Sequence, residues 1–404
     1  MFFEEKSFLP VILGSDITAY SLVRSFYQEY KVKPLVIHMS KNNYSVKSCF
    51  CDDFYVENLE KPEILLSTLE QVGSKYSNKK LILFGCGDWY VRCIIENKES
   101  LSKYYVIPYI DENLMNEIVL KDKFYEICEE LDIPHPDTFV YDCKENTPLT
   151  FDFKYPVIAK NANSALYHYA KFPGKKKVFT FNNKEDLEKM LENVRTSSYD
   201  YKFLIQDRIP GDDSNMRVLT CYSDRNGKVR FAALGHVLLE EHVPTALGNP
   251  CCIINEVNEE VVAQATKFLE HIGYTGFSNF DLKYDQRDGK YKFFEINIRL
   301  GRSNFYVTGS GFNVTKFIIE DLICENEIPY TIADNTEHIF SIVPKCVIKK
   351  YVSDEHAREK ALRLIKNHKW SNPLFYNKER NLKHWIFSIL AYFNQIKKFK
   401  KFYK

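Results

Sequence analysis

A chain of 404 residues, 45% hydrophobic and 27% charged, has the composition of an ordinary globular protein and the length for two or three packed units. Its net charge of +1 excludes a global attraction to nucleic acid, so a charged partner must be sought at local patches. The 11 cysteines are scattered without paired Cys-x-x-Cys spacing, which argues against a zinc site and predicts reduced, mostly buried thiols.

The N-terminal segment MFFEEKSFLP is acidic and has no long apolar run, so we expect no signal peptide and a cytoplasmic protein. Beyond it, short apolar runs predict strands at 8–14, 34–37, 81–84 and 104–109. Apolar residues at helical spacing predict helices between them, at 17–26, 61–71 and 91–97. Strands that alternate with helices form a parallel sheet, so this part predicts an α/β domain.

The middle of the chain predicts a helix followed by a series of strands. The helical pattern at 112–131 ends before Pro134, because proline cannot continue a helix. Further strands are expected at 155–160, 203–211, 216–222, 229–239, 276–284 and 291–298, with an amphipathic helix at 184–194. Residues 285–289 are a turn cluster, so the last two strands should form an antiparallel hairpin.

Polar side chains line one face of each strand of this hairpin. Strand side chains alternate with a period of two, so Asp281 and Lys283 share one face. Glu295, Asn297 and Arg299 share one face of the partner strand. Mg²⁺ prefers such oxygen ligands and keeps bonds to substrate phosphates, so the hairpin predicts a magnesium and polyphosphate site. A solvated polar face with cross-strand ion pairs is the alternative.

Two features upstream also fit a nucleotide. Lys160 ends an apolar strand, where its ammonium can reach a phosphate, and Lys123 lies in the preceding helical stretch. The strand that carries Gln206 breaks at Pro210-Gly211, which would leave backbone groups for an adenine and an acidic residue beyond the turn for the ribose. Each feature taken alone also fits a solvated lysine or an ordinary strand end.

The substrate candidates are less specific. Ser15 and Asp16 follow the first strand, at the carboxyl end where open α/β sheets bind ligands. The other candidates are polar residues close in sequence to the expected phosphate site, namely Arg217, His236, Arg302 and Ser303. An arginine binds a carboxylate through its planar fork, although each of these residues could equally make a structural bond.

In this order the elements resemble the ATP-grasp superfamily, over about residues 8–320. The implied fold is an N-terminal parallel α/β pre-ATP-grasp domain followed by a two-lobed ATP-grasp domain. The expected parts are the pre-ATP-grasp domain at 1–111 and the small lobe at 112–202. They are followed by the large lobe with the metal site at 203–345 and a C-terminal extension at 346–404. Two departures stand out: residues 161–177 contain one glycine where the family has a glycine-rich loop, and Gln206 stands where glutamate is frequent.

The resemblance implies a role for most of these candidates. The ATP contacts would be Lys123, Lys160, Gln206, Asp213 and the backbone at Asp207 and Ile209. The ligands of two Mg²⁺ ions, for which Mn²⁺ could substitute, would be Asp281, Glu295 and Asn297. Arg299 would steady the transferred phosphoryl group, and the further catalytic cations would be Lys283 and Arg217. The expected substrate contacts rest on position and side-chain chemistry and not on the resemblance; they are Ser15, Asp16, His236, Arg302 and Ser303.

Four segments resemble the bacterial D-aspartate ligases of peptidoglycan assembly more closely. They are ILGSD at 12–16, IPGDDSNMRVL at 209–219, LGHVLLE at 234–240 and GFSNFDLKYDQRDGKYKFFEINIRLGRS at 276–303. This resemblance implies an ATP-dependent carboxylate–amine ligase that works through an acyl-phosphate and joins D-aspartate to the lysine side chain of a peptidoglycan precursor.

Two other functions stay open. One is a ligase of the same fold that adds another amino acid to a different cell-envelope amine, such as a sugar. The other is a nucleotide-binding scaffold without turnover, which the complete set of expected metal ligands disfavours. A Rossmann dehydrogenase is disfavoured because Gly14-Ser15-Asp16 lacks the three-glycine fingerprint.

Two segments beyond the expected site carry predictions of their own. The polar, lysine-rich residues 161–177 are expected to form a mobile lid over the phosphates. From Leu382 onwards, apolar residues at helical spacing predict a helix with one apolar stripe, formed by Trp385, Ile386, Ile389, Leu390, Phe393 and Ile396. A lysine-rich run follows at 397–404. The helix would either pack on the core or rest on anionic lipid at the inner face of the membrane as a weak peripheral contact.

Overall fold

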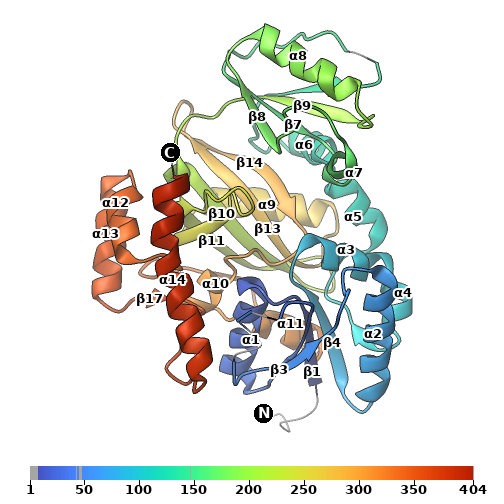
Figure 1. Ribbon diagram of the computed structural model, residues 1–404, viewed down its shortest axis with the longest axis vertical. Helices are drawn as coiled ribbons and strands as arrows, with labels where there is room; N and C mark the ends of the chain where they lie inside the picture. Colours follow the sequence, from blue (N-terminus) through green and yellow to red (C-terminus); the bar gives the residue numbers. More distant parts are fainter. Residues whose placement is uncertain (1–7, 42, 45–47, 146, 404) are drawn as a thin grey trace. The chain divides into compact units, whose positions relative to one another are not determined.

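The computed structural model describes residues 8–41, 43–44, 48–145 and 147–403 (Figure 1). The chain forms two compact units, and both are discontinuous in sequence. Unit 1 comprises Met1–Glu112, Asp212–Asn279 and Asn297–Lys404, and unit 2 comprises Asn113–Gly211 and Phe280–Ile296. The four consecutive parts expected from the sequence stay a prediction.

Unit 1 begins with the expected parallel α/β arrangement, which is confirmed. Its sheet has the order β3-β2-β1-β4-β5 with every pair parallel. The strands are β1 (Phe8–Leu13), β2 (Leu35–His38), β3 (Asp52–Tyr55), β4 (Lys80–Gly85) and β5 (Tyr105–Val106). The helices are α1 (Ile17–Tyr30), α2 (Pro62–Lys75), α3 (Asp88–Glu96) and α4 (Lys98–Leu101). The strand expected at 104–109 is short, consistent with Pro108, which has no N–H to donate to a ladder.

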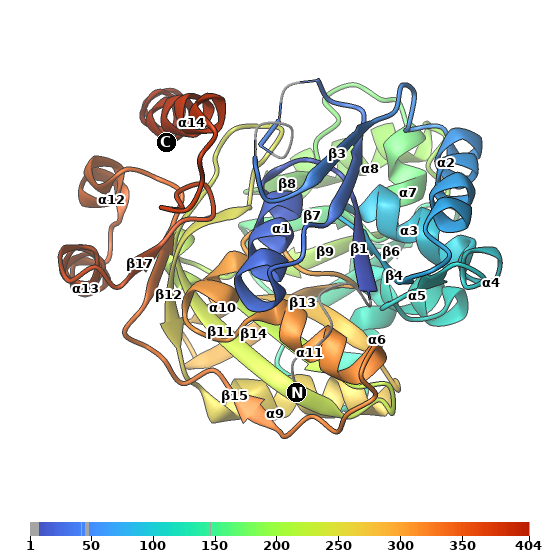
Figure 2. The same ribbon diagram turned by 90° about the horizontal axis from the view of Figure 1, so that it is seen from below.

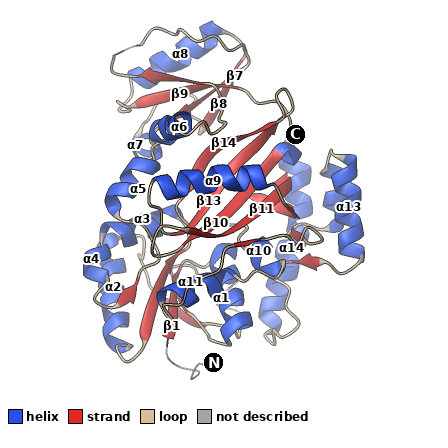
Figure 3. Cartoon of the chain, turned by 180° about the vertical axis from the view of Figure 1, so that it is seen from behind, coloured by secondary structure: helices blue, strands red, loops and turns tan. Residues whose placement is uncertain are grey.

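A second, mixed sheet follows, with the order β14-β13-β10-β11-β12-β16-β17 and β15 paired to β11. Its strands are β10 (Met216–Ser223), β11 (Val229–Glu240), β12 (Pro250–Glu256), β13 (Gly276–Asp285), β14 (Lys290–Asn297), β15 (Thr331–Ile332), β16 (Ile339–Ser341) and β17 (Trp370–Ser371). The helix α9 (Glu259–His271) lies across one face of this sheet (Figure 3). The expected hairpin is present, and each of its strands, β13 and β14, begins in one unit and ends in the other.

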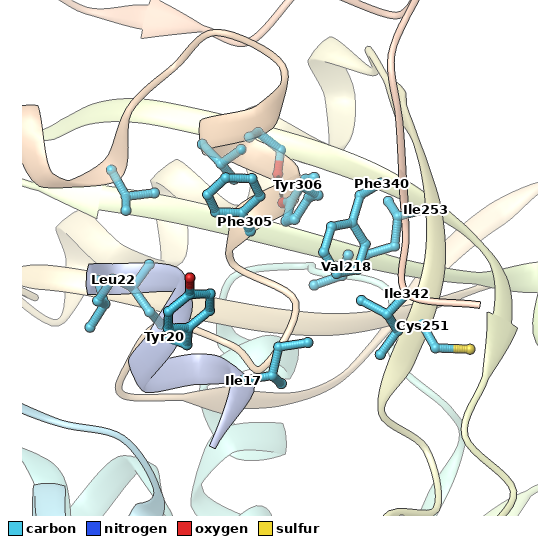
Figure 4. Packing of buried hydrophobic residues seen from close by; sticks show 14 of the residues in the cluster. Ile17, Tyr20, Leu22, Val218, Cys251, Ile253, Phe305, Tyr306, Phe340 and Ile342 are labelled. Atoms are coloured by element: carbon cyan, nitrogen blue, oxygen red, sulfur yellow. Dashed lines mark hydrogen bonds between the residues drawn. The ribbon is translucent and has the colours of Figure 1, made fainter. Parts of the chain in front are cut away.

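The core of unit 1 joins helices from distant parts of the sequence to this sheet. α1 packs against α10 (Phe305–Gly309) and α11 (Val314–Leu322). Figure 4 shows the buried side chains of α1 and α10 beside those of β10, β12 and β16. Three more helices, α12 (Lys345–Tyr351), α13 (Glu355–Lys366) and α14 (Leu382–Phe402), lie together near β16 and β17 (Figure 2). The expected C-terminal helix is therefore present.

Unit 2 contains an antiparallel sheet of order β6-β9-β7-β8. Its strands are β6 (Thr138–Asp142), β7 (Val157–Asn161), β8 (Val178–Phe181) and β9 (Lys202–Asp207). α8 (Lys184–Arg195) covers one face of this sheet (Figure 1), burying Leu187, Met190, Leu191 and Val194. The helix expected at 112–131 is two helices, α5 (Glu112–Ile118) and α6 (Lys121–Glu130), because Leu120 has an extended backbone.

The segment expected to form a lid has its own local structure. It contains the short helix α7 (Ser164–Tyr169), and the buried Tyr167 donates a hydrogen bond from its hydroxyl to the carbonyl of Lys176 at 2.7 Å. The ammonium of Lys175 donates to the carbonyls of His168 and Ala170 at 2.9 and 2.7 Å. Closure of this segment over a nucleotide stays a prediction.

The cysteines and helices agree with the composition. All 11 cysteines are free thiols and 8 of them are buried, as expected from their scattered positions. Within the described part of the chain, every helix is too short or too polar to cross a bilayer.

Candidate active site

Two lysines and a glutamate meet in unit 2. The ammonium of Lys121, at the start of α6, lies 2.9 Å from a carboxylate oxygen of Glu295 on β14. Lys160 on β7 donates a hydrogen bond to the hydroxyl of Tyr125 at 3.1 Å, and that hydroxyl donates to the carbonyl of Phe294 at 2.7 Å. Residues from a helix and two strands are thus joined into one cluster of charge.

The electrostatics of this cluster favour an anionic ligand. Burial, reinforced by the charge of Lys121, lowers the pKa of Lys160 to about 7. The negative charge of Glu295 raises this pKa, but by less. The ammonium of Lys121 holds the pKa of Glu295 well below its ordinary value, and Lys160 adds to this effect. The charges of Lys121 and Glu295 offset each other, and the partly protonated Lys160 leaves a local excess of positive charge. A polyphosphate would neutralise this charge and favour the protonated lysine.

The lysine that the structure brings into this cluster is Lys121, and the phosphate contact expected for Lys123 stays a prediction. Lys123 pairs instead with Glu126 at 2.6 Å, and both side chains are exposed. Lys121 is only 16% exposed and bonds the carbonyl of Ala162 through its backbone N–H, which fixes the start of α6 next to β7. The break at Leu120 is the local feature that turns Lys121 toward the cluster, and the helical pattern alone did not reveal it.

The hairpin keeps the expected alternation. Phe280 and Leu282 are buried, while Asp281 and Lys283 on the opposite face of β13 are half-buried. The ammonium of Lys283 donates to the carbonyls of Ile209 and Gly211, both at 3.1 Å, and its catalytic role stays a prediction. In this arrangement Lys283 fixes the connection that leaves β9.

The candidate metal ligands have suitable chemistry. Asp281 and Glu295 are half-buried carboxylates on hydrogen-bonded neighbouring strands, and Asn297 ends β14. Carboxylate and amide oxygens are donors that Mg²⁺ accepts, so these residues fit the ion. Among the residues that the structure describes, no three His, Cys, Asp or Glu side chains gather closely enough to hold a metal, so the amide of Asn297 would have to take part.

The expected adenine region lies at the end of β9. Gln206 is buried and donates a hydrogen bond from its amide to the hydroxyl of Thr138 at 2.7 Å. The N–H of Asp207 bonds the carbonyl of Asp137 at 3.0 Å, and its carboxylate pairs with Arg287. Strand β9 is therefore anchored on both sides up to Asp207, and the expected contact at Ile209 belongs to the connection that follows it.

In unit 1, Asp213 is engaged within the protein. One of its carboxylate oxygens accepts hydrogen bonds from the N–H of Glu240 and from the imidazole of His242, both at 2.9 Å. This bond raises the pKa of His242. Nearby in sequence, Arg217 pairs with Glu256, and the half-buried His236 bonds the carbonyl of Ser214 at 2.7 Å. Burial and the charge of Arg217 lower the pKa of His236 to about 4.

These two histidines are expected to affect stability with opposite pH dependence. The stabilisation from His242 is present below its ordinary pKa of 6.5 and is lost as the pH rises through its raised folded value. His236 stays neutral in the folded protein, so stability falls as the pH falls from 6.5 toward 4. In urea unfolding, His242→Gln should cost roughly 1 kcal/mol more at about pH 6 than at about pH 8.5. His236→Gln should cost less at about pH 6 than at about pH 8.5. If the cost of both substitutions changed in the same direction with pH, the opposite pKa shifts of His242 and His236 would be contradicted.

The substrate candidates at the start of α1 are brought together with Arg302. Gly14 has a φ of 110°, and an added Cβ would meet Cys86 at 3.1 Å, so this turn requires glycine. Asp16 then caps α1 by accepting from the N–H groups of Thr18 and Ala19, and it pairs with Arg302 at 3.0 Å. Ser15 is half-buried and Ser303 is fully buried.

The arginine expected to steady the phosphoryl group follows β14. Arg299 pairs with Asp88 at the start of α3 at 2.6 Å and donates to the carbonyl of Leu300 at 3.1 Å. Asp88 is 80% exposed, so this pair is open to water and could exchange for a bound anion at small cost. Unit 1 thus contributes one carboxylate, from Asp16, and two guanidinium groups, from Arg299 and Arg302. The Lys121–Glu295–Lys160 cluster lies within unit 2.

Known proteins share this sequence and fold. Residues 249–315 match the family described as the carbamoyl-phosphate synthase L chain, ATP binding domain. A D-aspartate ligase from Enterococcus faecium (strain Aus0004) is 36% identical over 411 residues, which cover 99% of this chain and 98% of that protein.

Two solved structures illustrate the shared fold. The L-amino acid ligase from Bacillus licheniformis gives a TM-score of 0.56 at 14% identity, over 78% of this chain and 74% of that one. The N5-carboxyaminoimidazole synthetase from Staphylococcus aureus complexed with ADP gives 0.56 at 15% identity, over 81% of this chain and 80% of that one. At these identities the likeness concerns the fold, whereas the match to the Enterococcus protein extends over nearly both whole sequences.

Proposed function

Because this chain belongs to the D-aspartate ligase family of the ATP-grasp superfamily, we propose that it joins D-aspartate to the lysine side chain of a peptidoglycan precursor. The chain is an ATP-dependent carboxylate–amine ligase with an ATP-grasp fold. The proposal therefore concerns its two substrates and the residues that act on them. The observation that supports it most is the 36% identity over 99% of the chain.

The reaction requires a carboxylate to become reactive toward an amine. The γ-phosphoryl group of ATP is transferred to a carboxylate oxygen, which releases ADP and forms an acyl-phosphate. The amine nitrogen then attacks the acyl carbon, the bond to the phosphate oxygen breaks, and the amine loses a proton. The protein's part is to position these groups and to neutralise charge, so no nucleophilic side chain is needed.

Within unit 2, we assign the phosphates of ATP to Lys121 and Lys160. Lys121 pairs with Glu295, and the charge of Glu295 also acts on Lys160. Lys160 is partly buried with a lowered pKa, so a phosphate oxygen would stabilise its charged form. Lys121 takes the place that the sequence suggested for Lys123. Asp281, Glu295 and Asn297 would hold two Mg²⁺ ions, which when bound offset the charge of the phosphoryl oxygens.

An amino-acid panel tests the choice of donor. ADP release should require D-aspartate, ATP, Mg²⁺ and a lysine-containing peptidoglycan precursor together, and L-aspartate should give about 100-fold less. If ADP release depended on the amine with another amino acid and not with D-aspartate, that other amino acid would be the donor. ADP release that does not depend on the amine would favour a nucleotide-binding scaffold.

The exposed side of α14 supports a further proposal, that this cytoplasmic ligase makes a weak peripheral contact with the inner face of the membrane. The helix packs through His384, Ser388, Gln395 and Phe399, and its apolar stripe faces solvent. The exposed members are Leu382, Ile386, Ile389, Leu390, Phe393 and Ile396. The exposed Lys397, Lys400 and Lys401 follow this stripe, and each lysine near an anionic surface adds about 1 kcal/mol to binding.

Vesicle co-sedimentation tests this contact. The wild type should bind vesicles rich in anionic lipid at low salt, and Ile386→Ser with Ile389→Ser should abolish binding. Val257→Ser with Tyr330→Ser removes two other exposed apolar side chains of unit 1 and should change nothing. Equal sedimentation of both double variants would contradict the proposal, as would a concentration-dependent dimer that is lost in the α14 variant.

A further inference from the structure

The C-terminal helix buries polar residues while its apolar stripe is exposed, and one of those polar residues lacks a structural explanation. His384 bonds the carbonyl of Leu374 at 3.2 Å, and Ser388 bonds His384 at 3.2 Å, so both serve the packing of α14. Gln395 differs from them. Its amide donates to Glu241 at 3.3 Å, but its carbonyl oxygen Oε1 has no partner among the described residues.

Gln395 lines a cavity of about 570 Å³ in unit 1. Ile17, Ile342 and Leu374 form part of its apolar wall, and its charged lining residues are Glu241, Arg302, Lys397 and Lys398. A space of this size is typical of small-molecule sites, which combine an apolar lining with a few placed polar groups. Neither Glu241 nor Gln395 was a candidate from the sequence, because nothing in their local pattern marks them.

Three unpartnered polar atoms belong to residues that line this cavity. Among the described residues, no hydrogen-bond partner is found for Oε2 of Glu241, Oε1 of Gln395 or Nε of Arg302. The Glu241 side chain is only 2% exposed, and its other oxygen, Oε1, lies 4.0 Å from Nη2 of Arg302. The three atoms are themselves buried, so side-chain rotation would have to turn them toward a ligand in the cavity. An unmet buried polar atom costs about 1–3 kcal/mol, more if charged, so a ligand that met these atoms after such a rotation would be favoured.

The chemistry of these atoms defines the ligand. Two acceptors, Glu241 and Gln395, require a donor such as an ammonium group, and the donor at Arg302 requires an acceptor such as a carboxylate. Lys397 and Lys398, which also line the cavity, would attract a ligand of net negative charge. An acidic α-amino acid carries an ammonium, an α-carboxylate and a net charge of this sign.

We infer that this cavity binds the ammonium and α-carboxylate of the donor amino acid, with Glu241 and Gln395 on the ammonium and Arg302 on the carboxylate. The inference rests on the proposed function, and it makes α14 part of the donor site. Gln395 is then a specificity residue: it recognises the α-ammonium, so a dicarboxylic acid that lacks this group is rejected.

Direct binding tests this inference without turnover. In calorimetric titrations the wild type should prefer D-aspartate over succinate, which lacks the ammonium, by about 100-fold. Glu241→Gln should reduce this preference to about 10-fold or less, because the anionic acceptor is lost. Gln395→Met, which keeps the size of the side chain, should weaken D-aspartate binding about tenfold and leave the KM for ATP unchanged.

Ser388→Ala is the matched control, since Ser388 is a buried polar residue of α14 that contacts His384. It should lower stability without changing the affinity for D-aspartate. Unchanged D-aspartate binding in Gln395→Met would overturn the inference, and the cavity would then hold only water. If the wild type proves to use a different amino acid, the proposed donor fails, and the same variants with that amino acid still decide the inference.

Discussion

Replacing Glu295 with alanine is expected to lower kcat by about 100- to 1000-fold while the protein stays folded. Glu295 is a half-buried carboxylate whose pKa Lys121 holds low, so it is ionised at neutral pH. Its removal takes away a proposed metal ligand and leaves Lys121 and Lys160 repelling each other. Steady-state kinetics at saturating Mg²⁺, with circular dichroism to confirm the fold, measures the effect.

Asn297→Ala is expected to reduce turnover in the same way, since its amide is the proposed third ligand. Glu126→Ala is the control for Glu295, because Glu126 is an exposed glutamate of unit 2 whose partner is Lys123. It should retain nearly full activity. Near-normal turnover of either Glu295→Ala or Asn297→Ala at saturating Mg²⁺ would contradict the metal assignment.

Lys160→Ala should raise the KM for ATP by at least about tenfold and slow phosphoryl transfer, with little change in amino-acid affinity. Lys121→Ala should have a similar effect, because Lys121 pairs with Glu295 and both lysines lower the pKa of that carboxylate. Lys123→Ala, only two positions away, should behave like the wild type, since Lys123 is exposed and bound to Glu126.

This pair of lysine variants is informative because composition and net charge change identically in both. If Lys123→Ala raised the KM for ATP and Lys121→Ala did not, the cluster seen in unit 2 would not be the phosphate site. If Lys160→Ala weakened the binding of the amino acid and not of ATP, Lys160 would belong to the substrate pocket.

The choice between Lys121 and Lys123 also shows what the sequence could not reveal. Residues two positions apart on a helix point to nearly opposite sides, so a shift in where the helix begins exchanges their roles. That start is set by the extended backbone at Leu120 and by the bond from Lys121 to Ala162, which is distant in sequence. The strands and the hairpin were predictable because their apolar alternation is local.

The C-terminal helix gives a second example. Its apolar spacing correctly predicted α14, but the stripe normally marks the buried face of a helix, and here it is exposed. His384, Ser388 and Gln395 take the buried side because they find partners in Leu374, in one another and in Glu241. Such partners lie far away in sequence, so the orientation of the helix and the cavity beside Gln395 could not be predicted locally.

The discontinuous units have a similar origin. Residues 280–296 return to unit 2 after a long excursion through unit 1, and this return places Glu295 beside Lys121. The hairpin motif is visible in the local sequence, but the helix that it contacts is not. The ion pair between them, Lys121–Glu295, joins residues more than 170 positions apart.

Mass spectrometry of the reaction product tests the central claim most directly. The purified protein is incubated with ATP, Mg²⁺, D-aspartate and a lysine-containing peptidoglycan precursor. We expect one new product whose mass equals that of the precursor plus one aspartyl residue, fragmentation that places this residue on the lysine side chain, and one ADP for each amide formed. Unmodified precursor together with ADP release, or an added amino acid other than D-aspartate, would contradict the proposed function.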